Sequence, residues 1–294
     1  MSAKHLLPPT EALLSLPIAE RIQAVRESRW IGYPRARSIL ASLEDLLDSP
    51  TTHRMAGLLI VGESNNGKTR IINQFERSHP RQMCPESERT RIPVLVIQAP
   101  PSVDEGRLYT EIIHGMKAPF RAPARIDQRQ HLAIRQMEIV GVRLLIIDEF
   151  HNALVARIQQ RNAFLTAVRY LGNTLRIPIV CAGTKAAFNA VQTDPQLQNR
   201  LRPVELPRWQ CNDEFRNLLS SFEKMVPLPQ PSDLSTPETA KLIYTMTEGT
   251  IGEVADLVNR AAVFAIKNDK QRIDKRILQS VGYVPPSRRQ RSAS

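Results

Sequence analysis

The sequence is poor in cysteine and has no long hydrophobic run. Its three cysteines, Cys84, Cys181 and Cys211, lie far apart and show no Cys-x-x-Cys or Cys/His spacing. This pattern argues against a disulfide framework, a zinc site and thiol chemistry. No apolar stretch approaches the roughly 20 residues that a membrane-spanning helix needs. Pro8 and Pro9 interrupt the segment that a secretory leader would keep apolar, so we expect a protein that works in the cytoplasm.

Acidic residues are in shorter supply than basic ones. The 294 residues include 29 Asp and Glu against 40 Lys and Arg, a formal net charge of +11, and 42% of them are hydrophobic. This is enough apolar material for a packed core, and the excess of basic residues suggests a polyanionic partner. Residues 270–294 alone hold seven Lys or Arg and one Asp. The last ten residues have little to bury, so we expect a basic, disordered tail over residues 283–294.

Short β-branched apolar segments alternate with helical patterns through the middle of the chain. The strand candidates are residues 57–61, 93–98, 143–147, 177–181 and 203–206. This alternation predicts an α/β core with a five-stranded parallel sheet covered by helices on both faces. After Trp209 four amphipathic helical patterns follow, at residues 212–224, 237–248, 252–266 and 271–279. We therefore expect three parts before the tail: an N-terminal helical segment over 1–50, the core over 51–209 and a helical lid over 210–282.

A phosphate-binding motif follows the first predicted strand. The pattern G-x-x-x-x-G-K-T is formed by Gly62, Glu63, Ser64, Asn65, Asn66, Gly67, Lys68 and Thr69, and Arg70 continues it into a helical segment. In this motif the glycines allow a tight turn, and backbone N–H groups at the helix N-terminus surround phosphates. The Lys68 ammonium reaches the β- and γ-phosphates, and the Thr69 hydroxyl binds Mg²⁺. We therefore expect a P-loop NTPase that uses ATP and Mg²⁺.

A second motif supplies the carboxylates that such an enzyme needs. Four apolar residues, 144–147, lead directly into Asp148 and Glu149. This is typical of a Walker B strand, in which Asp148 holds Mg²⁺ and Glu149 polarises the attacking water. The strand candidate between the two motifs and the presence of Glu149 favour ATP hydrolysis. A small-molecule phosphotransferase and a nucleotide switch that does not hydrolyse remain as alternatives.

With these motifs and the trailing helices, the chain resembles the AAA+ ATPases. The resemblance implies that Thr184, after the fourth strand candidate, is the sensor 1 residue. It also implies that Arg200, in the triplet Asn199-Arg200-Leu201, is an arginine finger that completes the active site of a neighbouring subunit, with Arg202 as the other candidate. The lid motif departs from the wider pattern, because residues 249–253, Gly-Thr-Ile-Gly-Glu, contain no sensor 2 arginine.

An ordered set of motifs is similar to one branch of this class, the TniB proteins, which are related to TnsC and the Mu phage B protein. The set comprises residues 29–34 (RWIGYP), 62–69 (GESNNGKT), 148–152 (DEFHN), 206–209 (LPRW) and 248–252 (EGTIG). The resemblance implies an ATP-dependent regulator of DNA transposition that oligomerises on target duplex DNA and recruits or activates a DDE transposase. A helicase loader of the IstB or DnaC type is the alternative. Trp30 and Tyr33 either stack on the adenine or pack within the protein.

A second basic segment is the candidate DNA contact. Its cations recur every four residues with one opposing carboxylate, Asp127, and they are Lys117, Arg121, Arg125 and Arg129. Pro119 and Pro123 predict a loop followed by a helix from about residue 127. We expect these side chains to follow the phosphates of duplex DNA without distinguishing its sequence, on the inner surface of a ring or filament.

Overall fold

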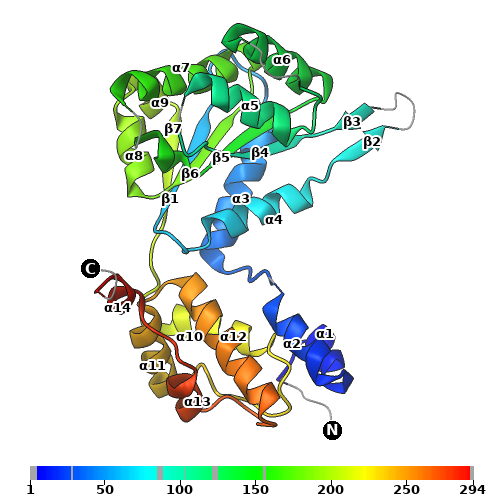
Figure 1. Cartoon of the computed structure of the whole chain (residues 1–294), viewed down its shortest axis with the longest axis vertical. Helices are drawn as coiled ribbons and strands as arrows, with labels where there is room; N and C mark the ends of the chain where they lie inside the picture. The colour runs from blue at the N-terminus through cyan, green and yellow to red at the C-terminus, as the bar shows by residue number, and fades with distance from the viewer. Residues whose placement is uncertain are drawn as a thin grey trace. The chain divides into compact units, whose positions relative to one another are not determined.

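The computed structural model describes residues 5–27, 29–84, 89–102, 104–120, 125–154 and 157–291, and it divides into two compact units. One unit consists of residues 34–207. The other combines the residues up to Tyr33 with those from Arg208 onward. Figure 1 shows the elements of both units in chain order.

The core of the 34–207 unit is a five-stranded parallel sheet. Its strands are β1 (Gly57–Gly62), β4 (Val94–Gln98), β5 (Leu144–Asp148), β6 (Ile179–Gly183) and β7 (Leu201–Leu206). They lie in the order β4-β5-β6-β1-β7, so β6 separates the strand of the phosphate loop from the strand of the Walker B motif. The predicted five-stranded parallel sheet is confirmed. Strands buried on both faces have continuous apolar sequences, which is why these five segments could be predicted.

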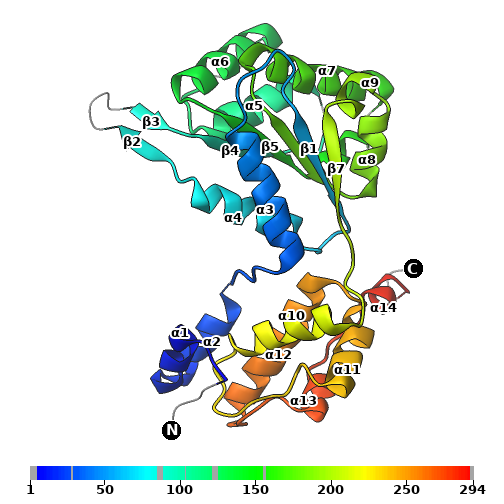
Figure 2. The ribbon, with the colours of Figure 1, turned by 180° about the vertical axis from the view of Figure 1, so that it is seen from behind.

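Helices cover both faces of this sheet. The helices of the unit are α3 (Pro34–Leu47), α4 (Lys68–Ser78), α5 (Glu105–Gly115), α6 (Ile126–Ile139), α7 (Ile158–Leu175), α8 (Lys185–Gln192) and α9 (Pro195–Gln198), with a 3₁₀ helix, η2 (Phe150–Leu154). Figures 1 and 2 show α5, α6 and α7 on one face and α3 and α4 on the other. Leu59, Leu145 and Cys181 belong to the core beneath α5 to α9. On each of these strands, the residues next to Leu59, Leu145 and Cys181 point to the opposite face of the sheet.

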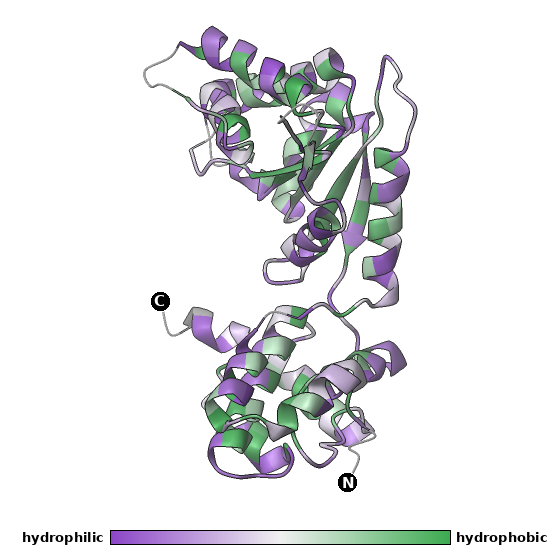
Figure 3. Cartoon of the chain, turned by 90° about the vertical axis from the view of Figure 1, so that its right-hand side faces the viewer, coloured by the Kyte–Doolittle hydropathy of each residue, from purple (hydrophilic) through white to green (hydrophobic). Residues whose placement is uncertain are grey.

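An antiparallel hairpin, β2 (Gln82–Cys84) and β3 (Arg89–Arg91), was not predicted. It follows α4, and the side chains described in it are exposed. Figure 3 shows that several strands of the central sheet are, by contrast, coloured as hydrophobic along much of their length. A short, polar and exposed hairpin has no apolar pattern by which it could be recognised in the sequence.

The second unit is entirely helical. Its elements are α1 (Pro8–Ala12), η1 (Leu13–Ser15), α2 (Ile18–Arg26), α10 (Asp213–Glu223), α11 (Pro237–Thr247), α12 (Ile251–Lys267), α13 (Lys275–Ser280) and α14 (Pro286–Arg291). α12 is central, because its Leu257, Val258 and Ala261 are completely buried and α2, α11 and α13 pack against it. Among the helices that the structure describes, none is both long and apolar enough to cross a membrane.

The N-terminal 50 residues are shared between the units instead of forming a separate segment. In α3 the apolar side chains of Ala36, Ile39 and Leu43 are completely buried, and α3 packs on α4 in the 34–207 unit. In α2 the buried Ile22 and Val25 belong to the helical unit, where α2 packs on α12. The unit that contains the sheet therefore begins at residue 34, and the helical unit includes the first helices of the chain.

Part of the predicted disordered tail is also structured, because α14 continues to Arg291. Glu253, at the start of α12, accepts hydrogen bonds from the Tyr283 hydroxyl at 2.6 Å and from the Arg289 guanidinium at 2.7 and 3.2 Å. The guanidinium also lies over the Tyr283 ring, 5.2 Å from its centroid. A bidentate Arg–carboxylate pair of this kind is among the stronger protein hydrogen bonds. The sequence of the tail predicts disorder because it carries little apolar surface. In the structure Glu253, 36 residues before Arg289, holds it in place.

Candidate nucleotide-binding site

The phosphate loop connects β1 to α4 through a turn that requires glycine. Gly67 has φ = 92°, a backbone conformation that L side chains rarely adopt, and Asn65 is also left-handed with φ = 59°. A Cβ atom on Gly62 would lie 2.9 Å from the Leu206 carbonyl oxygen, so no larger residue fits at the end of β1. The turn leaves the first N–H groups of α4 without partners in the helix, and these groups and the helix dipole favour an anion.

Asn66 anchors this loop to the end of the sheet. Its side chain is 1% exposed, and the amide Nδ2 donates to the carbonyl oxygens of Leu206 at 2.8 Å and Pro207 at 2.9 Å. The neighbouring carbonyl of Glu205 accepts two hydrogen bonds from Arg35 on α3. Three consecutive carbonyl groups at the end of β7, those of residues 205–207, are therefore held by side chains of the same unit.

Lys68 is a buried cation within the loop. Its Nζ donates to the carbonyl oxygens of Gly62 at 2.9 Å and Glu63 at 2.8 Å, and the residue is 5% exposed. Burial lowers the pKa of the ammonium, and the carboxylates of Glu149, Asp148 and Glu63 oppose this shift. A desolvated ammonium attracts phosphate oxygens more strongly than one in water.

Thr69 and Asp148 meet at the edge of the sheet. The Thr69 hydroxyl donates to Asp148 Oδ2 at 2.6 Å, and Asp148, the last residue of β5, is 7% exposed. Its other oxygen, Oδ1, accepts from the backbone N–H of Glu149 at 2.8 Å. A hydroxyl and a carboxylate side by side are the oxygen donors that Mg²⁺ takes beside phosphates, so these residues fit the metal that the motif implies.

Glu149 and Thr184 lie at the same carboxyl edge of the sheet. Glu149 follows the last residue of β5 and has a left-handed backbone conformation with φ = 54°. Its Oε2 atom lies 3.1 Å from Nε2 of His151. Thr184 follows Gly183, the last residue of β6, and begins α8 without capping it through its side chain. Because β6 lies between β1 and β5, Thr184 lies between the two motifs, and its role as a sensor stays a prediction. Glu63, Ser64 and Arg70 are exposed around the loop.

Arg200 lies at the opposite edge of the sheet. It immediately precedes β7, and the register pairs Gly57 with Leu201 and Gly62 with Leu206. The five steps from Gly57 to Gly62, at about 3.3 Å each, separate the two edges by roughly 17 Å. Arg200 therefore cannot reach the phosphate loop of its own chain. Arg202, on β7 itself, is exposed.

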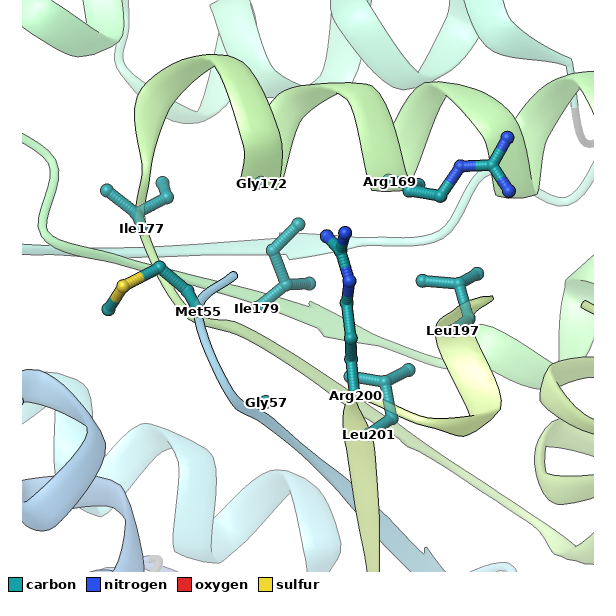
Figure 4. A pocket seen from close by; sticks show the side chains of 9 residues that line it. All are labelled: Met55, Gly57, Arg169, Gly172, Ile177, Ile179, Leu197, Arg200 and Leu201. Atoms are coloured by element: carbon teal, nitrogen blue, oxygen red, sulfur yellow. The ribbon is translucent and has the colours of Figure 1, made fainter. Parts of the chain in front are cut away.

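Arg200 sits in a small pocket between β7 and α7. Figure 4 shows its side chain pointing toward α7, where its guanidinium donates to Asn173 Oδ1. Burial and the like charges of Arg54 and Arg169 lower the pKa of Arg200, and Asp194 opposes them. Arg169 also lines the pocket, together with five apolar side chains: Met55, Ile177, Ile179, Leu197 and Leu201. A guanidinium in such surroundings would gain from an added anion.

The aromatic residues ahead of the core lie in the helical unit. Tyr33 is 9% exposed and packs edge-to-face against Trp209 with ring centroids 5.0 Å apart, and Trp30 is half-buried. Trp209 is also near Phe215, which contacts Tyr244. Within that unit Tyr33 is thus part of an aromatic cluster, and stacking on adenine stays a prediction.

Of the four basic residues predicted to bind DNA, the three that the structure describes lie in different surroundings. Lys117 lies in an exposed turn with φ = 57°, and Arg121 lies outside the described residues. Arg125 is exposed just before α6, which begins at Ile126, close to the predicted start. Arg129 is partly buried, with its guanidinium 5.8 Å from the centroid of the Phe120 ring and 3.4 Å from the Thr110 hydroxyl.

The sequence did not reveal the functional neighbours of these residues. His151 beside Glu149, Asn66 as an anchor, and Arg169 and Asn173 around Arg200 all depend on contacts between separate segments. His151 alone had a local signal, its spacing of two residues from Glu149. That spacing does not by itself bring two side chains together.

Comparison with known proteins agrees with this geometry. The family model described as bacterial TniB protein matches residues 21–211. No curated protein matches the chain at a significant level. Similar solved structures include the Aeropyrum pernix ORC2 protein in ADPNP–ADP complexes, at 12% identity and a TM-score of 0.63 over 88% of this chain and 70% of that one.

Two further structures contain DNA. The Aeropyrum pernix ORC1 protein in complex with DNA has 14% identity and a TM-score of 0.64, covering 88% of this chain and 68% of that one. The Drosophila ORC bound to DNA has 14% identity and a TM-score of 0.59, covering 95% and 70%. Identities this low establish the fold alone, which is that of P-loop ATPases of the AAA+ class. By the match over residues 21–211, the chain belongs to the TniB family of this class.

Proposed function

We propose that this protein is a cytoplasmic ATPase that regulates DNA transposition by assembling on duplex DNA with ATP and Mg²⁺ bound and by recruiting or activating a DDE transposase. The observation that carries the proposal is the convergence of Lys68, Thr69 and Asp148 at one edge of the sheet, with Glu149 immediately after them. Membership of the TniB family supports the transposition role.

Hydrolysis is assigned to this chain's own side chains in separate roles. Lys68 exchanges its two carbonyl partners for phosphate oxygens, and the N–H groups at the start of α4 surround the same phosphates. Thr69 and Asp148 hold Mg²⁺, which when bound neutralises phosphate charge. Glu149 orients the attacking water and accepts its proton. Thr184 contacts the terminal phosphate from the end of β6.

The position of Arg200 supports an oligomer. Because Arg200 lies about 17 Å from its own phosphate loop, it serves the nucleotide of an adjacent subunit. A head-to-tail contact of this kind repeats from chain to chain and gives a ring or a helical filament. ATP bound between subunits then stabilises the assembly, and hydrolysis releases it.

DNA binding is assigned to the segment from Lys117 to Arg129. Lys117 and Arg125 are exposed cations on either side of the loop, and their contacts would go to phosphates, so binding is insensitive to sequence. Two similar structures are bound to DNA, which supports the same partner here. Repetition of this segment in every subunit would build a continuous basic surface.

An ATPase assay with and without duplex DNA tests the proposal. We expect the wild type to hydrolyse ATP and duplex DNA of any sequence to raise turnover. Lys68→Ala should lose nucleotide binding, whereas Glu149→Gln should bind ATP but lose turnover, because one residue neutralises phosphate charge and the other acts on water. Glu138→Gln, an exposed change on α6, is the control. Wild-type turnover in Glu149→Gln would contradict the assigned role.

A second arm of the same assay isolates the DNA contact. The double variant Lys117→Ala/Arg125→Ala should keep DNA-independent turnover, lose the stimulation by DNA and flatten the salt dependence of binding by about 0.9 in log K per log salt for each lost phosphate contact. Lys224→Ala/Lys241→Ala removes the same charge from exposed positions of the helical unit. An equal loss in both double variants would show a general charge effect and contradict the assigned segment.

A further inference from the structure

His151 is held against the base of the proposed reaction. It lies in η2, two residues after Glu149, with its Nε2 3.1 Å from Glu149 Oε2. Both side chains are about one-third exposed, at 27% and 32%. We propose that His151 is a positioning residue that fixes the Glu149 carboxylate for its action on water, an inference that rests on the hydrolytic function proposed above.

The environment of the imidazole determines which nitrogen carries the hydrogen. His151 Nδ1 is buried and has no hydrogen-bond partner among the described residues. An N–H group at that atom would be removed from water without an acceptor, which is unfavourable. The hydrogen therefore resides on Nε2, and Nε2 donates to Glu149 Oε2. The protonated Nε2 of the ring therefore faces the carboxylate, and the unprotonated Nδ1 faces the interior of the protein.

Gly183 makes the room for this ring. A Cβ atom at residue 183 would lie 3.1 Å from the His151 backbone nitrogen, 3.4 Å from His151 Nδ1 and 2.6 Å from Ala187 Cβ. Gly183 is the last residue of β6 and precedes Thr184. His151 is thus packed between the Walker B turn and the strand that carries the sensor residue.

Among the described residues, His151 is the side chain that pairs with the Glu149 carboxylate, although the Lys68 ammonium also attracts it. The Glu149 backbone is left-handed, and its N–H is used by Asp148 Oδ1. A long glutamate side chain samples several rotamers, and only some of them place the carboxylate correctly. The His151 hydrogen bond occupies Oε2 and leaves Oε1 to accept a proton from water. A base that is itself oriented by a third group is a common arrangement in enzymes.

The kinetic test compares two variants at residue 151. His151→Leu removes the donor, and we expect kcat for ATP hydrolysis to fall about tenfold or more, as for other residues that orient a reacting group. The Kd for ATP should stay within about twofold, because no phosphate contact is lost. His151→Gln carries an N–H donor at a similar reach and should restore kcat to within about threefold of the wild type.

His79 provides a matched control. Its Nε2 lies 3.1 Å from Glu44 Oε2, the same separation, but at the far end of α4. His79→Leu should leave kcat unchanged. Equal losses in His151→Leu and His151→Gln, or a loss in His151→Leu that follows a fall in melting temperature, would indicate a merely structural role and overturn the proposal.

A readout without nucleotide separates this inference from the proposed function. In the full chain with ¹⁵N-labelled histidine, the His151 signals, identified by their absence in His151→Gln, should show a hydrogen on Nε2, and they should shift in Glu149→Gln. A bare Nε2 would overturn the positioning role even if the wild type hydrolyses ATP. Absence of wild-type hydrolysis with the expected spectrum would overturn the hydrolytic function and leave the contact intact.

Discussion

Asn66 connects two parts of the nucleotide-binding unit that are 140 residues apart in the sequence. Its Nδ2 satisfies two carbonyl groups, and its Oδ1 is buried with no partner among the described residues. The donor is therefore the part of this amide that stabilises the fold. Buried carbonyl groups that lose their donor keep the full cost of desolvation, which makes this contact sensitive to a change of a single atom.

A near-isosteric substitution tests this contact. Asn66→Asp keeps the size of the side chain but replaces the donor by an acceptor, so a carboxylate faces the carbonyls of Leu206 and Pro207. We expect a loss of about 3 kcal/mol or more in the free energy of unfolding, and a smaller loss of about 1–3 kcal/mol for Asn66→Ala. Urea denaturation measures both. Asn73→Asp, an exposed change on α4, is the control, and an Asn66→Asp variant as stable as the wild type would contradict the assignment.

Residues inside a contiguous motif are the ones that the sequence predicts well. Lys68, Thr69 and Asp148 were assigned from local spacing, and the structure brings Thr69 and Asp148 into contact. The partners of Asn66 and His151 could not be assigned in this way. Those contacts depend on how the end of β7 and the end of β6 pack against the loops, which no local pattern records.

α9 is a helix of only four residues, and its position determines where Arg200 begins β7. Asp194 holds it in two ways. Its Oδ1 accepts from the backbone N–H groups of Gln196 at 2.9 Å and Leu197 at 3.2 Å, which caps the helix, and its Oδ2 pairs with Arg169 of α7 at 3.1 Å. The pair is mostly buried, so it is stronger than a surface ion pair.

Two substitutions separate the cap from the ion pair. Asp194→Asn keeps a good capping side chain and loses the charge, and it should cost about 1 kcal/mol in the free energy of unfolding. Asp194→Ala loses both and should cost about 2–3 kcal/mol. Both should lower ATP turnover while nucleotide binding is retained, because the displaced residue is Arg200. Asp256→Ala breaks an exposed pair with Arg260 and should cost at most about 0.5 kcal/mol. Equal effects of Asp194→Asn and Asp194→Ala would show that the cap contributes nothing.

The elements that could not be predicted from the sequence, β2–β3 and α14, both lack an apolar pattern. The five central strands were predicted because they are buried on both faces and therefore apolar throughout. The hairpin β2–β3 is exposed, and α14 is held by Glu253 through polar contacts, so neither has an apolar pattern. The assignment of α2 and α3 to different units also escaped prediction, since amphipathic helices show that they pack but not against which partner.

At the scale of the whole molecule, the parallel sheet separates the two sets of residues that we propose to act together in ATP hydrolysis. Its carboxyl edge holds Lys68, Asp148 and Glu149, and its amino edge holds Arg200. A single chain therefore cannot complete the site that we propose. Two chains arranged head to tail can, because the amino edge of one then meets the carboxyl edge of the next.

Mixing two inactive variants tests this arrangement. Arg200→Ala keeps an intact phosphate loop but offers no guanidinium to its neighbour, and its turnover should fall by about 10³-fold with ATP binding retained. Lys68→Ala has the opposite defect. In a 1:1 mixture, roughly a quarter of head-to-tail contacts combine an intact loop with an intact Arg200, so ATPase activity should return to about that fraction of the wild type. The double variant Lys68→Ala/Arg200→Ala, mixed with Arg200→Ala, provides no complete contact and should restore nothing. If the first mixture forms mixed assemblies and stays as inactive as the second, Arg200 does not act across a subunit contact.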